Sequence, residues 1–429
     1  MPLSRRRFLH LSAALSLTAG ASLSLTACSG GSADSGTQTQ DTGADLPALA
    51  LSKAPWVQLL GPTSARLRFE TREARALPVT IALPDGSSLT ATPALREDEL
   101  DYAWDFELED VPPDEPGLHV LQELLLEDLQ PGAQYGWSVD LGGGEQVSGT
   151  FRAPPAAGEA FRFGWLADTM RPTVTETAAA LRSAAPDLLL HGGDMVYQTS
   201  PADTWTGFWQ AMATLFAGSA LGVTLGNHDF EDMDEVHVMF ERLFMPQGDS
   251  GANRYNAFSF GGVRFVHIDT ESDRFGFPEE VEGMWDWVRA ELQATADDPN
   301  LRFAIVLMHR PMFTLSKYWV SDATERDARH AMFVEFGVPL VFCGHVHAYE
   351  HWEVEGVHYI VDGGGGALSY DPVEEKDAVD EARPGESDQQ IAHSRTYGVT
   401  VVDVGEDGRL AVQRLAAGTA AVEDSFTVG

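Results

Sequence analysis

Beyond residue 160, five short apolar runs each end in side chains that can bind metal ions. The runs read FGWLAD, DLLLHGGDMVY, LGVTLGNHD, FAIVLMH and LVFCGHVH, and helical patterns separate most of them. Apolar runs of strand length that alternate with helices indicate an α/β fold with a largely parallel sheet. Because loops at the carboxyl ends of such strands meet at one edge, we expect these polar ends to converge.

The polar ends supply carboxylates, imidazoles, an amide and a phenol. The polar residues at these ends that can bind metal are Asp168, Asp194, Tyr197, Asn227, His228, Asp229, His309, His345 and His347. This mixture suits hard or borderline metal ions, and such groups are costly to bury unpaired. Each residue alone has an ordinary explanation, such as a helix cap at Asp168 or a core histidine at His309. Together and in this order they predict a metal site.

Before residue 155 the pattern is one of short alternating strands. Examples are residues 65–70, 79–83 and 135–139, which turns such as PDG and PG separate. The stretch LEDLQPGAQYGWSV, followed by GTFRAPP, resembles a fibronectin type III-like sandwich. We therefore predict a β-sandwich scaffold over 51–155 and a catalytic α/β domain over 160–429.

In the second domain, apolar residues at three-to-four spacing predict five helices. They cover residues 173–185, 204–217, 235–244, 280–294 and 322–336. The acidic stretch 372–388 is predicted to be a solvated loop, with a lid over the site as the alternative. The run Gly363–Gly366 is predicted to be a turn, because no lysine or helix signal follows that would favour a phosphate cradle.

The first 28 residues are predicted to be an export signal rather than part of the fold. SRRRFL precedes an apolar stretch and is typical of the twin-arginine route. LTAC, ending at Cys28, resembles a lipoprotein signal, in which that thiol is acylated. The low-complexity residues 29–50 would then act as a tether that anchors the domain to the cell envelope. The alternatives are a plain export signal, with secretion and an incidental cysteine, or an uncleaved anchor.

The chain is strongly acidic, with a formal net charge of −37. A field of that sign repels nucleic acid and anionic membrane surfaces, so we expect neither as a partner. It also repels phosphate esters, so a phosphate site would need its own local cations. A salty habitat is another explanation of the acidity. With only Cys343 left after the signal, no disulfide framework is expected despite export.

Four blocks in the second domain resemble the signatures of purple acid phosphatases, within the calcineurin-like metallophosphoesterases. The blocks are GDMVY, GNHD, VLMH and GHVH, and the resemblance covers about residues 160–415. The tyrosine of GDMVY indicates the purple subgroup. The resemblance implies a four-layer α/β/β/α sandwich, preceded by a β domain, and a site with two metal ions.

The resemblance also implies a role for each residue of the site. One metal ion, Fe(III), would be bound by Asp168, Asp194, Tyr197 and His347. A second ion, iron, zinc or manganese, would be bound by Asp194, Asn227, His309 and His345. Asp194 suits the bridging role because a carboxylate has two oxygens. His228 would face the phosphate and assist the leaving group.

Two departures from the family pattern concern the first and fourth blocks. The family has Asp-x-Gly where this chain has Asp168-Thr-Met170. Plant-like members carry extra histidines where Tyr318 and Trp319 stand here. Candidate substrate contacts in their place are Arg310, Tyr318 and His351.

The implied function is hydrolysis of small phosphate monoesters by attack of a metal-bound hydroxide. Two cations bind the phosphoryl oxygens and lower the pKa of a bound water. A phosphodiesterase or nucleotidase on the same site is one alternative, and phospholipid headgroups would be further substrates of that kind. A surface binding protein with a vestigial phosphatase domain is an alternative of another class, and the intact ligand set argues against it.

Overall fold

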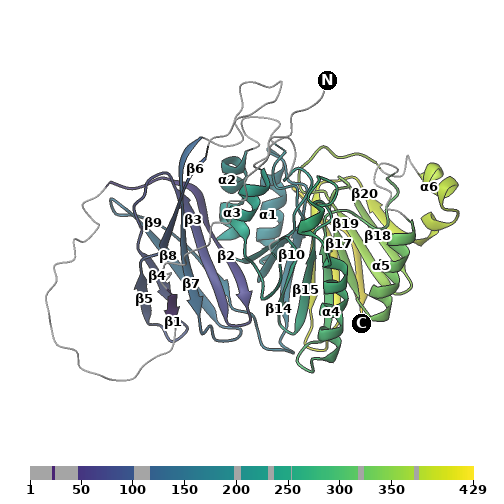
Figure 1. Cartoon of the computed structure of the whole chain (residues 1–429), viewed down its shortest axis with the longest axis horizontal. Helices are drawn as coiled ribbons and strands as arrows, with labels where there is room; N and C mark the ends of the chain where they lie inside the picture. Colours follow the sequence, from purple (N-terminus) through teal and green to yellow (C-terminus); the bar gives the residue numbers. More distant parts are fainter. Residues whose placement is uncertain are drawn as a thin grey trace.

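Two large β-sheets face each other in the computed structural model, and helices cover their outer surfaces (Figure 1). The structure describes residues 22–24, 47–100, 116–197, 204–229, 236–252, 254–316, 323–371 and 376–429. Cys28, Tyr318 and Trp319 lie outside these residues, as do nearly all of the predicted signal and most of the predicted tether. Ser22–Ser24 form a short strand, β1, that pairs with β7.

The first sheet has eleven strands. In spatial order they are β1, β7 (Gly117–Glu127), β3 (Ser64–Thr71), β2 (Leu51–Gly61), β12 (Ala220–Val223), β11 (Leu188–His191), β10 (Phe161–Leu166), β21 (Gly398–Val404), β22 (Leu410–Ala416) and β23 (Val422–Val428), with β6 (Ala94–Leu100) beside β7. Strands β10, β11 and β12 are parallel, so the loops that follow them leave from the same edge.

The second sheet has eight strands. In spatial order they are β13 (Ser250–Gly251), β14 (Asn256–Phe260), β15 (Val263–Ile268), β16 (Phe303–Met308), β17 (Leu340–Cys343), β19 (Val357–Asp362), β18 (Tyr349–Val354) and β20 (Gln390–Ser394). Strands β15, β16, β17 and β19 are parallel to one another. Each sheet therefore contributes a row of loops at its carboxyl edge.

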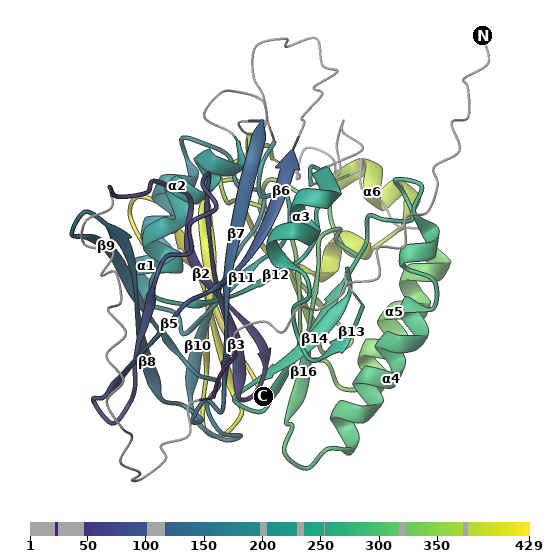
Figure 2. The ribbon, with the colours of Figure 1, turned by 60° about the vertical axis from the view of Figure 1, so that its left-hand side comes forward.

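Helices form the two outer layers of the fold. They are α1 (Val174–Ala184), α2 (Trp205–Phe216), α3 (Val236–Phe244), α4 (Met284–Asp297), α5 (Ala323–Glu335) and α6 (Lys376–Ala382), with short 3₁₀ turns at Pro278–Glu280 and Glu386–Gln389. The first three helices share a buried cluster with the first sheet, whereas α4 and α5 share one with the second. Figure 2 shows α1 and α2 on one flank of the molecule and α4 and α5 on the other.

Aromatic side chains fill the space between the two sheets. Phe163 of β10 packs edge-on against Phe265 of β15 and Phe342 of β17. The ring centroids are 5.3 Å apart in the first pair and 5.8 Å apart in the second. Such contacts between rings add to the stabilisation that burial itself provides. With helices outside both sheets, the predicted four-layer α/β/β/α arrangement is confirmed.

The local sequence signals account for the helices. Thr204 accepts a hydrogen bond from the Gly207 amide at 3.0 Å and so caps α2, where the sequence predicted its start. The helix predicted to begin at residue 280 begins later, at Met284, because a 3₁₀ turn precedes it. The loop predicted over 372–388 is wrong for residues 376–382, which form α6 and bury Val379.

The N-terminal β region also has two facing sheets. Its second layer contains β5 (Ser88–Ala91), β4 (Val79–Ala82), β8 (Gln134–Gly142) and β9 (Glu145–Arg152). Its first layer continues into the large sheet, because Val57 of β2 pairs in parallel with Ala220 of β12. No local signal in either strand predicts this continuous ladder. Kinship with the fibronectin type III domains stays a prediction, as do the domain boundaries.

Within the described part of the chain, no helix has the length and apolar character that crossing a membrane requires.

A buried ion pair joins the second sheet to the first. Arg414 of β22 and Asp362 of β19 are fully buried, with Nε and Oδ2 3.0 Å apart. Thr400 of β21 donates to the same carboxylate at 2.7 Å. Burial nevertheless raises the pKa of Asp362 to about 6, so its charged form depends on these partners.

Replacing Arg414 with Met should therefore destabilise the fold. The change leaves the Asp362 carboxylate buried without its cation, and we expect a loss of about 3–5 kcal/mol in the free energy of unfolding. Urea unfolding of Arg414→Met measures this loss. The matched control is Arg409→Met, since Arg409 forms an exposed pair with Asp407 and should change stability by less than about 0.5 kcal/mol. Equal stability of the two variants would contradict the role assigned to Arg414.

Candidate metal centre

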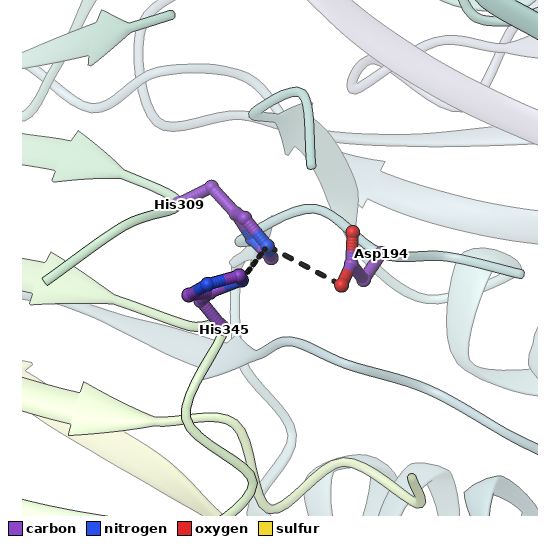
Figure 3. A group of neighbouring side chains, drawn as sticks. All are labelled: Asp194, His309 and His345. Atoms are coloured by element: carbon purple, nitrogen blue, oxygen red, sulfur yellow. Dashed lines mark hydrogen bonds and ion pairs between the residues drawn. The ribbon is translucent and has the colours of Figure 1, made fainter. Parts of the chain in front are cut away.

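The predicted ligands come together at the carboxyl edges of both sheets. Asp168, Asp194 and Asn227 follow the parallel strands β10, β11 and β12 of the first sheet. His309 and His345 follow β16 and β17 of the second sheet. Figure 3 shows these two histidines pointing from their sheet toward Asp194. The expected convergence of the strand ends is thus present in the fold.

One group of ligand atoms surrounds the hydroxyl of Tyr197. This oxygen lies 3.0 Å from Asp168 Oδ1, 3.2 Å from Asp194 Oδ2 and 2.9 Å from His347 Nε2. Ligands that share one metal ion lie about 3–3.5 Å apart when each bond is about 2.1 Å long. These four residues are the set that the family resemblance assigns to Fe(III).

A second group of ligand atoms surrounds His309 Nε2. This nitrogen lies 3.1 Å from Asn227 Oδ1, 3.2 Å from His345 Nδ1 and 3.3 Å from Asp194 Oδ2. Asp194, His309 and His345 are buried, and their ligand atoms all lie within 4.8 Å of one another (Figure 3). The four residues are the set that the resemblance assigns to the second metal.

Asp194 belongs to both groups through a single oxygen. Its Oδ2 atom approaches Tyr197 and His309, whereas its Oδ1 atom accepts the backbone N–H of His228 at 2.7 Å. The expectation that both carboxylate oxygens of Asp194 suit it to bridging is therefore revised. Oδ2 alone is in position to be shared, because the protein backbone already occupies Oδ1.

Backbone carbonyls fix the orientation of two of the imidazoles. His309 Nδ1 lies 2.8 Å from the carbonyl of Gly192, and His347 Nδ1 lies 3.0 Å from that of Leu368. A carbonyl can only accept, so in both rings Nδ1 carries a proton, and a ring that loses its second proton loses it from Nε2. The lone pair of Nε2 then faces the cluster, which is the arrangement expected of metal-binding histidines.

Burial makes the acidic groups of the cluster costly to ionise. Burial and the nearby Asp194 carboxylate raise the pKa of Asp168 well above its usual value. Burial, followed by the charges of both carboxylates, likewise raises the pKa of Tyr197. His309 offsets this cost in part, since it lowers the pKa of Asp194 against the effect of burial. A cation among these groups would favour every anionic form, so the donor set fits a metal ion.

The backbone is strained at three of the predicted ligands. Asp168, Asp194 and His345 have φ values of 59°, 52° and 68°, in the left-handed region that L-residues rarely adopt. Each such residue costs on the order of 1–3 kcal/mol and persists only where the surroundings enforce it. The strain indicates that the fold positions these side chains for a function.

Asp229 binds backbone amides of the loops rather than contributing an atom to the cluster. Its Oδ2 atom accepts the amides of Asp194 and Gly226 at 3.1 and 2.8 Å, and its Oδ1 atom accepts that of Met195 at 3.2 Å. The loops lie so close that a Cβ on Gly226 would be 2.2 Å from the Asp194 nitrogen. In the GNHD block, therefore, the asparagine points into the cluster while the glycine and aspartate hold its loop.

The fold accommodates Met170 because the residue that faces it, Gly366, has no side chain. A Cβ on Gly366 would lie 2.6 Å from the Met170 carbonyl oxygen and 2.8 Å from its nitrogen. Gly366 itself has a φ of 153°. The glycines at 363–366 thus form a turn that passes directly over the segment after Asp168, as the sequence predicted for that run. The small residue at this contact is supplied by the facing turn instead of by position 170.

Arg310 and Glu271 complete the rim of the cluster. The guanidinium NH1 of Arg310 lies 2.8 Å from His345 Nε2, so this substrate-contact candidate is near the ligands. Glu271, which the sequence analysis missed, is buried and pairs with Arg310 at 2.8 Å. The signal was present, because the apolar run RFVHI of β15 ends in DTE like the other strand ends.

The expectation for His351 as a substrate contact is wrong. Strand β18 carries it away from the cluster, and its two ring nitrogens bond Asp424 and His358 at 2.8 and 2.9 Å. Tyr318 lies outside the described residues.

The calcineurin-like phosphoesterase family profile matches residues 161–349, which hold all the predicted ligands. This part of the chain is therefore a calcineurin-like phosphoesterase domain. Among characterised relatives, purple acid phosphatase 21 of Arabidopsis thaliana is 27% identical over 241 residues, covering 52% of each chain. Purple acid phosphatase 22 of the same plant is 26% identical over 227 residues, covering 49% of each. The predicted resemblance to this group is confirmed.

A solved structure shares the fold over most of the chain. A purple acid phosphatase from yellow lupin (Lupinus luteus) seeds superposes with a TM-score of 0.68 at 16% identity, covering 88% of this chain and 74% of that one. At that identity the likeness shows the fold alone. The chain spans about half the length of the curated relatives it matches.

Divalent metal ions should stabilise the folded protein through this cluster. A cation that binds only the folded state adds about 2.7 kcal/mol when its free concentration is 100 times its Kd. Thermal unfolding with and without a chelator measures the effect, with Zn²⁺ or Mn²⁺ as the added ion. Asp194→Asn should abolish it, because Asp194 belongs to both groups of ligands. A metal-dependent shift of equal size in wild type and Asp194→Asn would contradict this assignment.

Proposed function

We propose that the chain is a phosphatase that uses two metal ions to hydrolyse small phosphate monoesters. The observation that carries the proposal is the position of Asp194 Oδ2, which lies within 3.3 Å of ligand atoms in both groups. A shared carboxylate oxygen between two complete donor sets is what a two-metal centre requires. The relatives named as purple acid phosphatases support the same reading.

The two donor sets differ in a way that favours two different ions. The group around Tyr197 offers two carboxylates, a phenol and an imidazole, and its three oxygen donors, which are hard and anionic when ionised, favour Fe(III). The group around His309 offers two imidazoles, an amide and one carboxylate oxygen, which suit divalent iron, zinc or manganese. When bound, such ions would bind phosphoryl oxygens and lower the pKa of a water molecule.

In this proposal His228 assists the leaving group. Its backbone N–H anchors Asp194, and its ring packs against that of Tyr197 with centroids 4.1 Å apart. The side chain is half-buried, so it can meet a substrate at the edge of the cluster. A proton donated from the imidazole to the departing oxygen would avoid the release of an unstable alkoxide.

The N-terminal sequence supports the further proposal that this phosphatase is exported. SRRRFL and the LTAC motif at Cys28 favour the twin-arginine route and a lipid anchor in the cell envelope. Such a placement would present the cluster to phosphate esters outside the cytoplasm. The small phosphate ester is the partner this proposal requires.

Replacing His228 with Ala tests the proposed chemistry. Loss of a general acid should lower kcat for an alkyl phosphate monoester, whose alkoxide is a poor leaving group, by about 10²–10⁴-fold. Metal content, measured by elemental analysis, should stay near that of wild type, because the ring belongs to neither donor set. His393→Ala is a control, since His393 is exposed on strand β20.

One outcome would overturn the proposal, and another would contradict only the role of His228. A wild-type protein that binds metal but hydrolyses neither a monoester nor a diester would favour a binding protein with a vestigial site. One relative is in fact named a probable inactive purple acid phosphatase. Loss of the metals from His228→Ala would contradict the role given to that residue alone.

A further inference from the structure

Arg310 places a permanent positive charge beside the second donor set. His345 turns Nδ1 toward His309, so its Nε2 atom points away from that set and toward Arg310 NH1, 2.8 Å distant. The Arg310 side chain is 15% exposed, and so reaches both the cluster and solvent. In a chain with a net charge of −37, a cation at this position is well suited to attract an oxyanion.

A buried carboxylate fixes the direction of this guanidinium group. Nε and NH2 of Arg310 lie 2.9 and 2.8 Å from Oε2 of Glu271, whose side chain is fully buried. Because Nε and NH2 are bound to Glu271, NH1 is directed toward His345. An arginine held along one edge keeps its planar geometry and loses little further freedom when it binds an anion.

The loop that carries Glu271 is itself held in place. Asp269 Oδ1 accepts the amides of Glu271 and Ser272 at 2.7 and 3.0 Å. Thr270 donates its hydroxyl to Glu271 Oε1 at 2.7 Å and lies 3.1 Å from the backbone nitrogen of Arg310. The loop after β15 and the loop after β16 therefore form one unit that orients Arg310.

We infer that Arg310 binds the phosphate oxygen that distinguishes a monoester from a diester, and that Glu271 positions it. This inference rests on the proposed phosphatase function. A monoester has three non-bridging oxygens and two negative charges near neutral pH, whereas a diester has two such oxygens and one charge. An arginine beside the metal ligands can engage the additional oxygen through charge-assisted hydrogen bonds. Arg310 is then a specificity-determining residue, and Glu271 is a positioning residue.

The test compares a monoester, a diester and inorganic phosphate in the metal-loaded full-length protein. Arg310→Met should lower kcat/KM for p-nitrophenyl phosphate by roughly 10²-fold, as loss of one oriented donor typically does. Its effect on bis(p-nitrophenyl) phosphate should be less than about threefold, because the diester lacks the oxygen that Arg310 binds. Calorimetric titration should show that Arg310→Met binds inorganic phosphate at least about tenfold more weakly than wild type does.

Two further variants separate recognition from folding. Arg310→Met leaves Glu271 buried without its partner, so the double variant Glu271→Gln/Arg310→Met removes both charges and should show the same selectivity change. Arg264→Met is the matched control, since Arg264 is also held by carboxylates, at 2.6 Å from both Asp249 and Glu291. It lies at the opposite end of β15, and its loss should leave the ratio of the two activities unchanged.

Unchanged phosphate affinity in Arg310→Met or in the double variant would overturn the inference. An equal loss of activity toward both esters would also overturn it, because that pattern indicates a general structural role. The phosphate titration does not depend on turnover. If wild type bound phosphate through Arg310 but hydrolysed neither ester, the inference would stand and the proposed function would fail.

Discussion

Two carboxylates of like charge, Asp168 and Asp194, are buried almost completely on neighbouring loops of one sheet. Such a pair is unfavourable in a dry interior unless a cation compensates it. Many features nearby serve to keep the pair in place. The backbone is strained at both residues, Asp229 binds the amide of Asp194, and the amide of His345 binds Asp168 Oδ2 at 2.8 Å. The strained backbone and the buried like charges lower the stability of the folded protein, and metal binding would offset that loss.

The four-layer fold explains how two donor sets come to share one oxygen. The first sheet presents Asp194 and the second presents His309 from the facing edge, so the cluster exists only while the sheets stay aligned. Aromatic rings packed edge-to-face between the sheets and the buried pair of Arg414 with Asp362 maintain that alignment. Trp165 reinforces it by donating from Nε1 to the carbonyl of Asp362 at 3.2 Å. The contacts that stabilise the interior therefore also maintain the geometry of the site.

Strand-end chemistry is local, so the sequence alone could predict which candidate ligand residues converge, as well as the α/β class. Each apolar run ends where its ligand stands, and the parallel strands then bring the ends together. Contacts between distant segments could not be predicted from the sequence in this way. The pairing of β2 with β12 joins residues 57 and 220, and nothing in either strand specifies the other. Which oxygen of Asp194 faces both groups depends on where the amide of His228 lies, and Gly366 opposite Met170 depends on two distant loops.

The central claim is that two metal ions share Asp194, and anomalous X-ray diffraction from crystals of the metal-loaded protein tests it most directly. Data collected on either side of the iron and zinc absorption edges would place and identify each ion. We expect two peaks flanking Asp194 Oδ2, one beside the Tyr197 oxygen and one beside His309 Nε2. A single peak, or peaks away from these residues, would contradict the account.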